Sequence, residues 1–216
     1  MLSSDRELQR LLENVVGDLS LAMNHIQLQQ LATHFSLLLK WNEKINLTSI
    51  RKPEEIATRH FEESLFLTKL LPAPQSLMVD VGSGAGFPGL PLKIVWPDVA
   101  TVLLEPNHKK ATFLKEVVRG CGLAGVDVQT ERLESVARGD LAGRAALVTM
   151  RAVKPSRELL ADLKRLVAPA GQVALFVSEQ SASELRESLE FQWVTPAPIP
   201  HSERRVVLLG TSSSDS

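Results

Sequence analysis

An acid followed by glycines at alternate positions is the feature of this sequence best suited to binding a ligand. The apolar stretch Leu77–Val81 predicts a buried strand, and Gly82, Gly84 and Gly86 follow it. Glycines at a strand end let the backbone approach a phosphate or nucleoside closely. A dinucleotide fingerprint has its third glycine at the sixth position, where this chain has Phe87. The spacing therefore disfavours a dinucleotide, and a turn without any ligand is the less favoured alternative.

Two acidic residues flank this turn and could orient it or bind the ligand. Asp80 lies within the first strand, where its carboxylate can orient the turn or meet an amino group of the ligand. Glu105 ends the second predicted strand, 19 positions after Gly86. An acid at this point of an α/β fold can accept hydrogen bonds from ribose hydroxyls. A solvated carboxylate at a helix start is the alternative.

Alternating strands and helices from residue 77 onward predict the framework that positions these residues. Strands are expected at 77–81, 100–104, 126–130, 145–150, 172–177, 190–195 and 204–210, and helices at 89–96, 107–121, 155–167 and 181–189. This order predicts an α/β fold with a mostly parallel, doubly wound sheet that binds ligands at the carboxyl ends of its strands. A short proline-rich link joins the last two strands, which are expected to pair antiparallel.

The first 71 residues have helical periodicity instead. Apolar residues recur at helical spacing over Leu8–Val16 and Leu28–Leu39, and Pro53 suits the first turn of a third helix. Pro72-Ala73-Pro74 breaks the pattern. We therefore expect an N-terminal helical extension at 1–71, a ligand-binding domain at 72–210 and a disordered polar tail at 211–216.

The run from Asp80 to Gly86 resembles the first motif of the S-adenosylmethionine-dependent methyltransferases. A parallel sheet closed by an antiparallel last strand is also similar to their class I, Rossmann-like architecture, which implies seven strands. On this resemblance, Leu133 and Glu134 lie where the adenine would rest, and Arg151 follows the fourth strand near the transferred methyl group. Arg151 could orient cofactor or substrate through its fork of donors, and a surface salt bridge is the alternative.

The residues after the fourth strand restrict the methyl acceptor. The segment from Thr149 to Pro155 lacks the Asn/Asp-Pro-Pro-aromatic motif common in enzymes that methylate exocyclic amines. Cys121 is expected to pack at a helix end away from the ligand rather than to act as a nucleophile. By elimination the acceptor has no proton to lose, as is true of guanine N7. No residue is expected to be catalytic in the sense of a general base, and Arg151 is the nearest candidate.

Several further elements make the resemblance specific. They are Lys40-Trp41-Asn42-Glu43-Lys44-Ile45-Asn46-Leu47-Thr48-Ser49-Ile50, the loop Gly86-Phe87-Pro88-Gly89-Leu90-Pro91-Leu92, His60-Phe61-Glu62-Glu63-Ser64-Leu65, and Arg151-Ala152. In this order, over about residues 35–180, the set resembles the bacterial ribosomal RNA small subunit methyltransferase G family, also called glucose-inhibited division protein B. The resemblance implies methyl transfer from S-adenosylmethionine to the N7 of a specific guanine in 16S rRNA, within the 30S subunit or a precursor.

The resemblance also implies which residues contact the cofactor. They are Gly82, Phe87, Leu133, Glu134 and Arg151, to which the fold adds Asp80, Gly84, Gly86 and Glu105. One position departs from the family pattern His-x-x-Asp-Ser-Leu, because this chain has Glu63 in place of the aspartate. The acid is kept with one more methylene, which puts the detail of a capping or cross-domain hydrogen bond in doubt.

Local basic patches could supply the positive charge that RNA binding requires, although the formal net charge is −1. We expect phosphate contacts from Lys109, Lys110, Lys154 and Arg157. Charged runs are more often solvated helix faces. Trp41 is expected to anchor the extension to the sheet domain, His60 to be structural and His108 to cap or flank its helix. No spacing of His, Cys and Asp predicts a metal site.

Length and composition further restrict the class of protein and its compartment. A chain of 216 residues is long enough for one domain with an appendage or for two small domains. One cysteine fits a reducing compartment, and the sequence predicts neither a signal peptide nor a membrane span, so a cytoplasmic monomer is expected. The competing hypotheses are a methyltransferase with another acceptor, an NAD-dependent oxidoreductase and a non-catalytic nucleotide-binding regulator.

Overall fold

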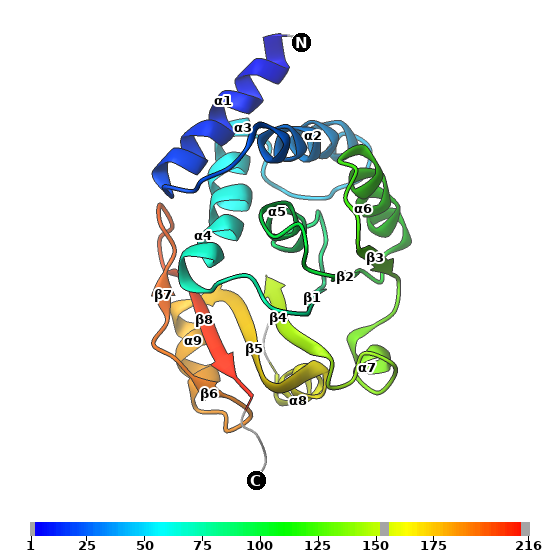
Figure 1. Cartoon of the computed structure of the whole chain (residues 1–216). Helices are drawn as coiled ribbons and strands as arrows, with labels where there is room; N and C mark the ends of the chain where they lie inside the picture. The colour runs from blue at the N-terminus through cyan, green and yellow to red at the C-terminus, as the bar shows by residue number, and fades with distance from the viewer. Residues whose placement is uncertain (1–2, 152–155, 213–216) are drawn as a thin grey trace.

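The computed structural model describes residues 3–151 and 156–212 (Figure 1). Its helices are α1 (Ser3–Asp18), α2 (His25–Asn42), α3 (Pro53–Ile56), the π-helix η1 (Ala57–Glu62), α4 (Glu63–Leu70), α5 (Gly89–Val95), α6 (His108–Gly120), α7 (Leu133–Val136), α8 (Arg157–Leu166) and α9 (Glu179–Arg186). Its strands are β1 (Leu77–Val81), β2 (Thr101–Leu104), β3 (Val126–Gln129), β4 (Ala145–Arg151), β5 (Val167–Ser178), β6 (Gln192–Trp193), β7 (Ala197–Pro198) and β8 (Arg205–Thr211).

The strands form one sheet in the order β3-β2-β1-β4-β5-β8-β6, and β7 also pairs with β8. Strands β1 to β5 pair in parallel, whereas β8 is antiparallel to β5, β6 and β7. The predicted class I α/β architecture is confirmed. The sheet has eight strands where seven were expected, because Pro196, which has no N–H to donate, separates β6 from β7 at the sheet edge.

Helices cover both faces of the sheet (Figure 1). Val79 and Val81 of β1 pack with α7, α8 and α9, whereas Leu103 of β2 packs with α5 and α6. A sheet that is buried on both faces needs apolar side chains at almost every strand position, and all four residues of β2 are buried. Asp80 is the one acid within the apolar strand β1.

The N-terminal helices share one hydrophobic core with the sheet domain. Leu31 and Phe35 of α2 belong to the same buried cluster as Leu90 of α5 and Phe113 of α6. Trp41 meets Phe113 edge to face at a centroid distance of 5.8 Å, which confirms it as an anchor of the extension. The predicted boundary at residue 71 therefore marks the end of the helices, but the core continues across it.

Two local predictions need correction. The single helix expected after Pro53 is a succession of α3, η1 and α4, with a π-helical turn in the middle; such turns are uncommon and occur often at functional sites. The disordered tail expected at 211–216 is wrong for its first two residues, since Thr211 belongs to β8 and the Ser212 amide donates to the Gly171 carbonyl at 2.9 Å. The rest of that expected tail, 213–216, lies outside the described residues. No helix of the described chain has the length and apolar character to span a membrane.

Candidate active site

The glycine turn lies where the carboxyl ends of β1, β2 and β4 meet. Val81 at the end of β1 is in register with Leu104 and with Met150. The amides of Gly82 and Ser83 both donate to the Leu104 carbonyl, at 2.9 and 3.0 Å. The turn is therefore tied to β2 by its own backbone, at the edge of the sheet where α/β proteins bind ligands.

The three glycines of the turn serve different purposes. Gly82, Gly84 and Gly86 have φ of 69°, 56° and 88°, a region that side chains disfavour. A Cβ at Gly82 would meet no atom of the described residues within 4 Å, and one at Gly84 would lie 3.8 Å from the Gly82 carbonyl. These two glycines present bare backbone to open space. A Cβ at Gly86 would instead overlap Leu90 of α5, so Gly86 is needed for packing, and its predicted cofactor contact stays a prediction.

Asp80 orients the turn from beneath. It is fully buried, and it accepts hydrogen bonds from Thr149 Oγ1 at 2.7 Å and from the Gly89 amide at 3.3 Å. Burial raises the pKa of Asp80 to about 6, against the opposing effect of these hydrogen bonds. Of its two predicted roles, the contacts support orientation of the turn. Thr149 was missed as its partner because no sequence motif marks a threonine inside a strand.

Glu105 holds the turn from the side of β2. Its Oε2 accepts from the Gly84 amide at 2.8 Å, and its Oε1 accepts from the Asn107 amide at 2.9 Å. Each carboxylate oxygen has a second lone pair, so a ribose contact stays compatible with this arrangement. Glu105 is buried, which makes the solvated-carboxylate alternative wrong.

A cavity of about 310 Å³ opens beside the turn. It is lined by Val81, Gly82, Leu104, Pro106, Glu131, Arg132, Leu133, Glu134, Met150 and Leu159. The cavity brings together three predicted cofactor residues, Gly82, Leu133 and Glu134. Leu133 and Glu134 begin the short helix α7. Sequence reasoning missed Met150 and Leu159, because apolar residues of β4 and α8 look like ordinary core. Apolar walls with a few polar groups suit a planar heterocycle.

Phe87 is held by two imidazoles of the extension. The rings of His34 and His60 stack against it at centroid distances of 4.8 and 4.7 Å. His34 Nε2 lies 2.9 Å from the Ala85 carbonyl in the turn, so this nitrogen must carry the proton. His60 Nε2 lies 2.9 Å from Thr48 Oγ1, which confirms His60 as structural. His34 was missed, although a lone polar residue on the apolar face of α2 was a usable signal.

Burial keeps both imidazoles neutral. It lowers the pKa of His34 to about 4 and that of His60 to about 3, and the Arg151 charge lowers the pKa of His60 further. The Phe87 side chain is 6% exposed. Its role in the structure is to anchor the glycine turn to the extension, and its predicted cofactor contact stays a prediction.

Arg151, the last residue of β4, does not line the cavity but faces the extension. Its Nη2 donates to the Arg59 carbonyl at 2.6 Å and lies 3.3 Å from Glu63 Oε2. Glu63 Oε2 is also 3.0 Å from Arg205 Nη1 of β8. The Arg151 side chain is 9% exposed, so the predicted surface salt bridge is a buried one that links two parts of the fold. Burial lowers the pKa of Arg151 to about 10.

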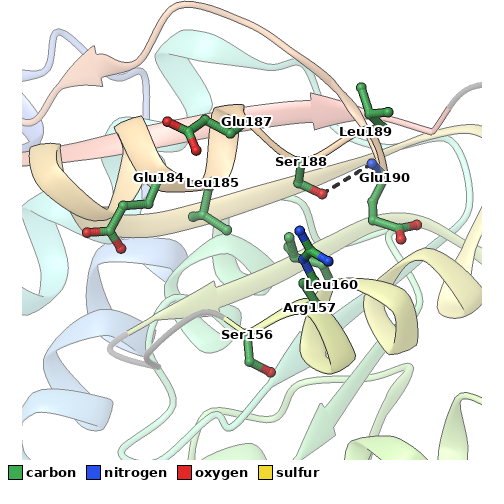
Figure 2. A pocket seen from close by; sticks show the side chains of 9 residues that line it. All are labelled: Ser156, Arg157, Leu160, Glu184, Leu185, Glu187, Ser188, Leu189 and Glu190. Atoms are coloured by element: carbon green, nitrogen blue, oxygen red, sulfur yellow. Dashed lines mark hydrogen bonds between the residues drawn. The ribbon is translucent and has the colours of Figure 1, made fainter.

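The predicted RNA contacts fall in two different surroundings. Lys109 and Lys110 lie in the first turn of α6, at the same sheet edge as the glycine turn, and their amides donate to Asn107 Oδ1. Lys154 lies outside the described residues. Arg157 lines a separate cleft of about 510 Å³ between α8 and the α9–β6 segment (Figure 2). The other charged residues of that cleft are Glu184, Glu187 and Glu190.

We expect Lys109→Ala/Lys110→Ala to make the salt dependence of RNA binding shallower, with the slope of log K against log salt falling by about 0.7–0.9 for each lost phosphate contact. Arg157→Ala should change the slope less, because three carboxylates in its cleft oppose a phosphate. Filter binding to a 16S rRNA fragment over a range of potassium chloride concentrations measures both slopes. An unchanged slope in the double variant contradicts the assignment of these lysines.

The remaining predicted residues have structural roles. His108 is the exposed first residue of α6, and Asn107 caps that helix, so the expected capping role of His108 is wrong. Cys121 is buried and its Sγ donates to the Gln30 carbonyl at 3.2 Å, so it packs as predicted. Within residues 3–151 and 156–212, no three His, Cys, Asp or Glu side chains are grouped so that they could hold a metal ion.

Comparison with known proteins agrees with this geometry. The chain is 37% identical over 179 residues to a ribosomal RNA small subunit methyltransferase G of Halorhodospira halophila, covering 83% of each chain. It is 40% identical over 167 residues to one of Sorangium cellulosum, covering 76% of this chain and 69% of that relative. A solved S-adenosylmethionine-dependent methyltransferase from Aquifex aeolicus matches in fold with a TM-score of 0.61 at 15% identity, covering 77% of this chain and 96% of that chain.

The family match extends from the extension into the last strands of the sheet. The sequence profile described as rRNA small subunit methyltransferase G matches residues 27–202. This span contains α2 from its third residue onward, with His34, and also the glycine turn, the cavity at the carboxyl edge and the Glu63–Arg151 pair. The chain belongs to the rRNA small subunit methyltransferase G family.

Proposed function

We propose that this protein transfers the methyl group of S-adenosylmethionine to the N7 of a specific guanine in 16S rRNA. The observation that carries the proposal is the bare backbone of Gly82 and Gly84 beside a cavity at the carboxyl edge of the sheet, in a chain of this family. The proposal includes action in the cytoplasm, as a monomer, on the 30S subunit or a precursor.

The residues present fit S-adenosylmethionine. Gly82 and Gly84 leave space that a side chain would occupy, so the turn can accept the amino acid end of the molecule. The apolar side chains of Leu133 and Met150 can pack against an adenine ring, and Glu105 can still accept from ribose hydroxyls. When bound, S-adenosylmethionine supplies an electrophilic methyl group on a sulfonium.

The residues of this chain would act by positioning. Asp80, Glu105 and His34 fix the glycine turn through the hydrogen bonds described above. N7 of guanine is an acceptor with an available lone pair and no proton, so no general base is required. Holding the acceptor in line and excluding water are then the main contributions to rate. Arg151 does not line the cavity, but its Nη1 has no hydrogen-bond partner among the described residues, and we propose that this donor orients the cofactor or the substrate.

A radiolabel transfer assay tests this function. The protein is incubated with labelled S-adenosylmethionine and either 30S subunits or naked 16S rRNA from cells that lack the activity, and the RNA is cleaved at N7-methylguanine. Label at one guanine supports cofactor, acceptor atom and substrate together. Comparison of the two substrates shows whether assembly is required.

Two other results would change the proposal. Binding of S-adenosylmethionine in calorimetry without transfer to either RNA points to another acceptor, such as a protein or a small molecule. Binding of NAD in place of S-adenosylmethionine overturns the assignment of the glycine turn. Catalysis by positioning also predicts that no single titratable side chain is indispensable as a proton acceptor.

A further inference from the structure

Glu63 is, with Arg59, one of two residues through which the helical extension contacts the end of β4. It follows the π-helical turn η1 at the start of α4 and is 1% exposed. Its carboxylate lies 3.3 Å from Arg151 Nη2 and 3.0 Å from Arg205 Nη1. One carboxylate thus faces two guanidinium groups that come from two different strands.

Stability alone does not explain this arrangement. Burying an ion pair removes charges from water, and the attraction between them often does no more than offset that loss. Burial raises the pKa of Glu63, although the charges of Arg151 and Arg205 lower it. Such a group is a better device for fixing geometry than for stabilising a fold, and geometry is what a reaction without a general base depends on.

The contacts of Arg151 show that the group held by the extension is its guanidinium. Its Nη2 donates to the Arg59 carbonyl at 2.6 Å and forms an ion pair with Glu63 Oε2 at 3.3 Å, while this Oε2 has no hydrogen-bond partner among the described residues. Its Nη1 is buried and has no hydrogen-bond partner among the described residues. One side of the guanidinium is therefore anchored by the extension, while a donor on the other side is left unused.

We infer that Glu63 is a positioning residue, which holds the guanidinium of Arg151 in one orientation for its contact with the cofactor or the substrate. This inference rests on the proposed function, because it needs Arg151 to make that contact. It also gives the extension a direct part in the reaction, in addition to its packing against the sheet domain. The longer side chain at the position of the family aspartate still reaches Arg151.

The neighbouring residue offers a matched control. Glu62 is equally buried, and its Oε1 lies 2.9 Å from His201 Nδ1 on the segment between β7 and β8. It therefore links the same junction of η1 and α4 to the same end of the sheet as the Glu63–Arg205 pair does. The difference is that no ion pair or hydrogen bond joins Glu62 to Arg151 among the described residues.

The experiment compares E63Q, E63D, E62Q, R205Q, R151Q and the double variant E63Q/R151Q. Calorimetry gives the Kd for S-adenosylmethionine, transfer to 30S subunits gives KM and kcat, and thermal melting monitors the fold. E63Q should raise the Kd or KM about tenfold, as expected for coupled neighbours, while E63D stays within about threefold of the wild type because it keeps the charge. E62Q should leave Kd and KM unchanged even where it lowers Tm.

The double variant separates positioning from a structural role. If Glu63 acts through Arg151, E63Q/R151Q binds and reacts no worse than R151Q, and R205Q affects Tm more than Kd. The inference is overturned if E63Q leaves Kd, KM and kcat at wild-type values. It is also overturned if R205Q changes these constants as much as E63Q does and the effects of E63Q and R151Q multiply in the double variant. Wild-type protein that binds no S-adenosylmethionine would instead overturn the proposed function.

Discussion

Gly86→Ala is expected to lower the free energy of unfolding by about 2–4 kcal/mol, whereas Gly82→Ala should lower it by about 1 kcal/mol. Both positions have positive φ, so in both variants an alanine is forced into the left-handed region, which strains the backbone. At Gly86 the added methyl group also overlaps the Leu90 side chain and lies 3.3 Å from Leu114, so these closely packed side chains must shift to admit it. Urea unfolding followed by circular dichroism measures both changes.

Affinity for S-adenosylmethionine should rank the two variants in the opposite order. The methyl group of Gly82→Ala enters the open space beside the cavity, where the cofactor is proposed to lie. We expect its Kd to rise at least about tenfold, a change of about 1.4 kcal/mol, while Gly86→Ala measured below its unfolding transition binds more nearly as the wild type does. Equal losses of stability, or an unchanged Kd in Gly82→Ala, would contradict this division between a packing glycine and a ligand glycine.

Local sequence patterns gave the positions of most elements and of the turn. The strand–acid–glycine pattern around Asp80 depends on steps of one or two residues, and the structure places each of its members at the carboxyl edge. Leu133 and Glu134 were placed by counting strands, which works because parallel strands end at a common edge. In such cases the tertiary position follows from chain order.

Pairs of residues distant in sequence were harder to predict. The Thr149–Asp80 hydrogen bond spans 69 positions, and the Arg151–Arg59 bond spans 92. Nothing in a single sequence says which donor meets which acceptor, because helix packing decides it. The same holds for His34, whose chemistry follows from its position beneath the Ala85 carbonyl rather than from its neighbours in α2. Gly86 shows a different gap, since the local motif suggested a ligand contact and did not indicate the close packing of Leu90 that also requires a glycine there.

The two buried histidines predict a strong loss of stability in mild acid. Their pKa values in the folded protein, about 4 for His34 and about 3 for His60, lie below the 6.5 of an unperturbed histidine. Below pH 6.5 the unfolded chain therefore binds protons that the folded protein does not. Each histidine lowers the free energy of unfolding by about 1.4 kcal/mol per pH unit. Together they remove about 5 kcal/mol between pH 6.5 and 4.5.

Buried acids act in the opposite direction over part of this range. The pKa of Asp80 is raised from 3.8 to about 6, so the folded protein binds more protons than the unfolded chain between these values. This contributes about 2 kcal/mol of stability by pH 4.5. Burial also raises the pKa of Glu62 and of Glu63, with the same sign. The net loss in the wild type is therefore smaller than the histidines alone would give, and the contribution of each histidine has to be measured by difference.

His34→Phe isolates one of these contributions. Phenylalanine fills a similar space and has no proton to gain, although the Ala85 carbonyl loses its donor and stability at neutral pH falls by about 1–3 kcal/mol. Between pH 6.5 and 4.5 the variant should lose about 2.7 kcal/mol less than the wild type, in urea unfolding at half-unit steps of pH. His60→Gln should give a difference of the same size, and the double variant should give their sum. Parallel curves for wild type and His34→Phe would mean that this imidazole takes up its proton in the folded protein, and that the extension does not hold the glycine turn through a neutral histidine.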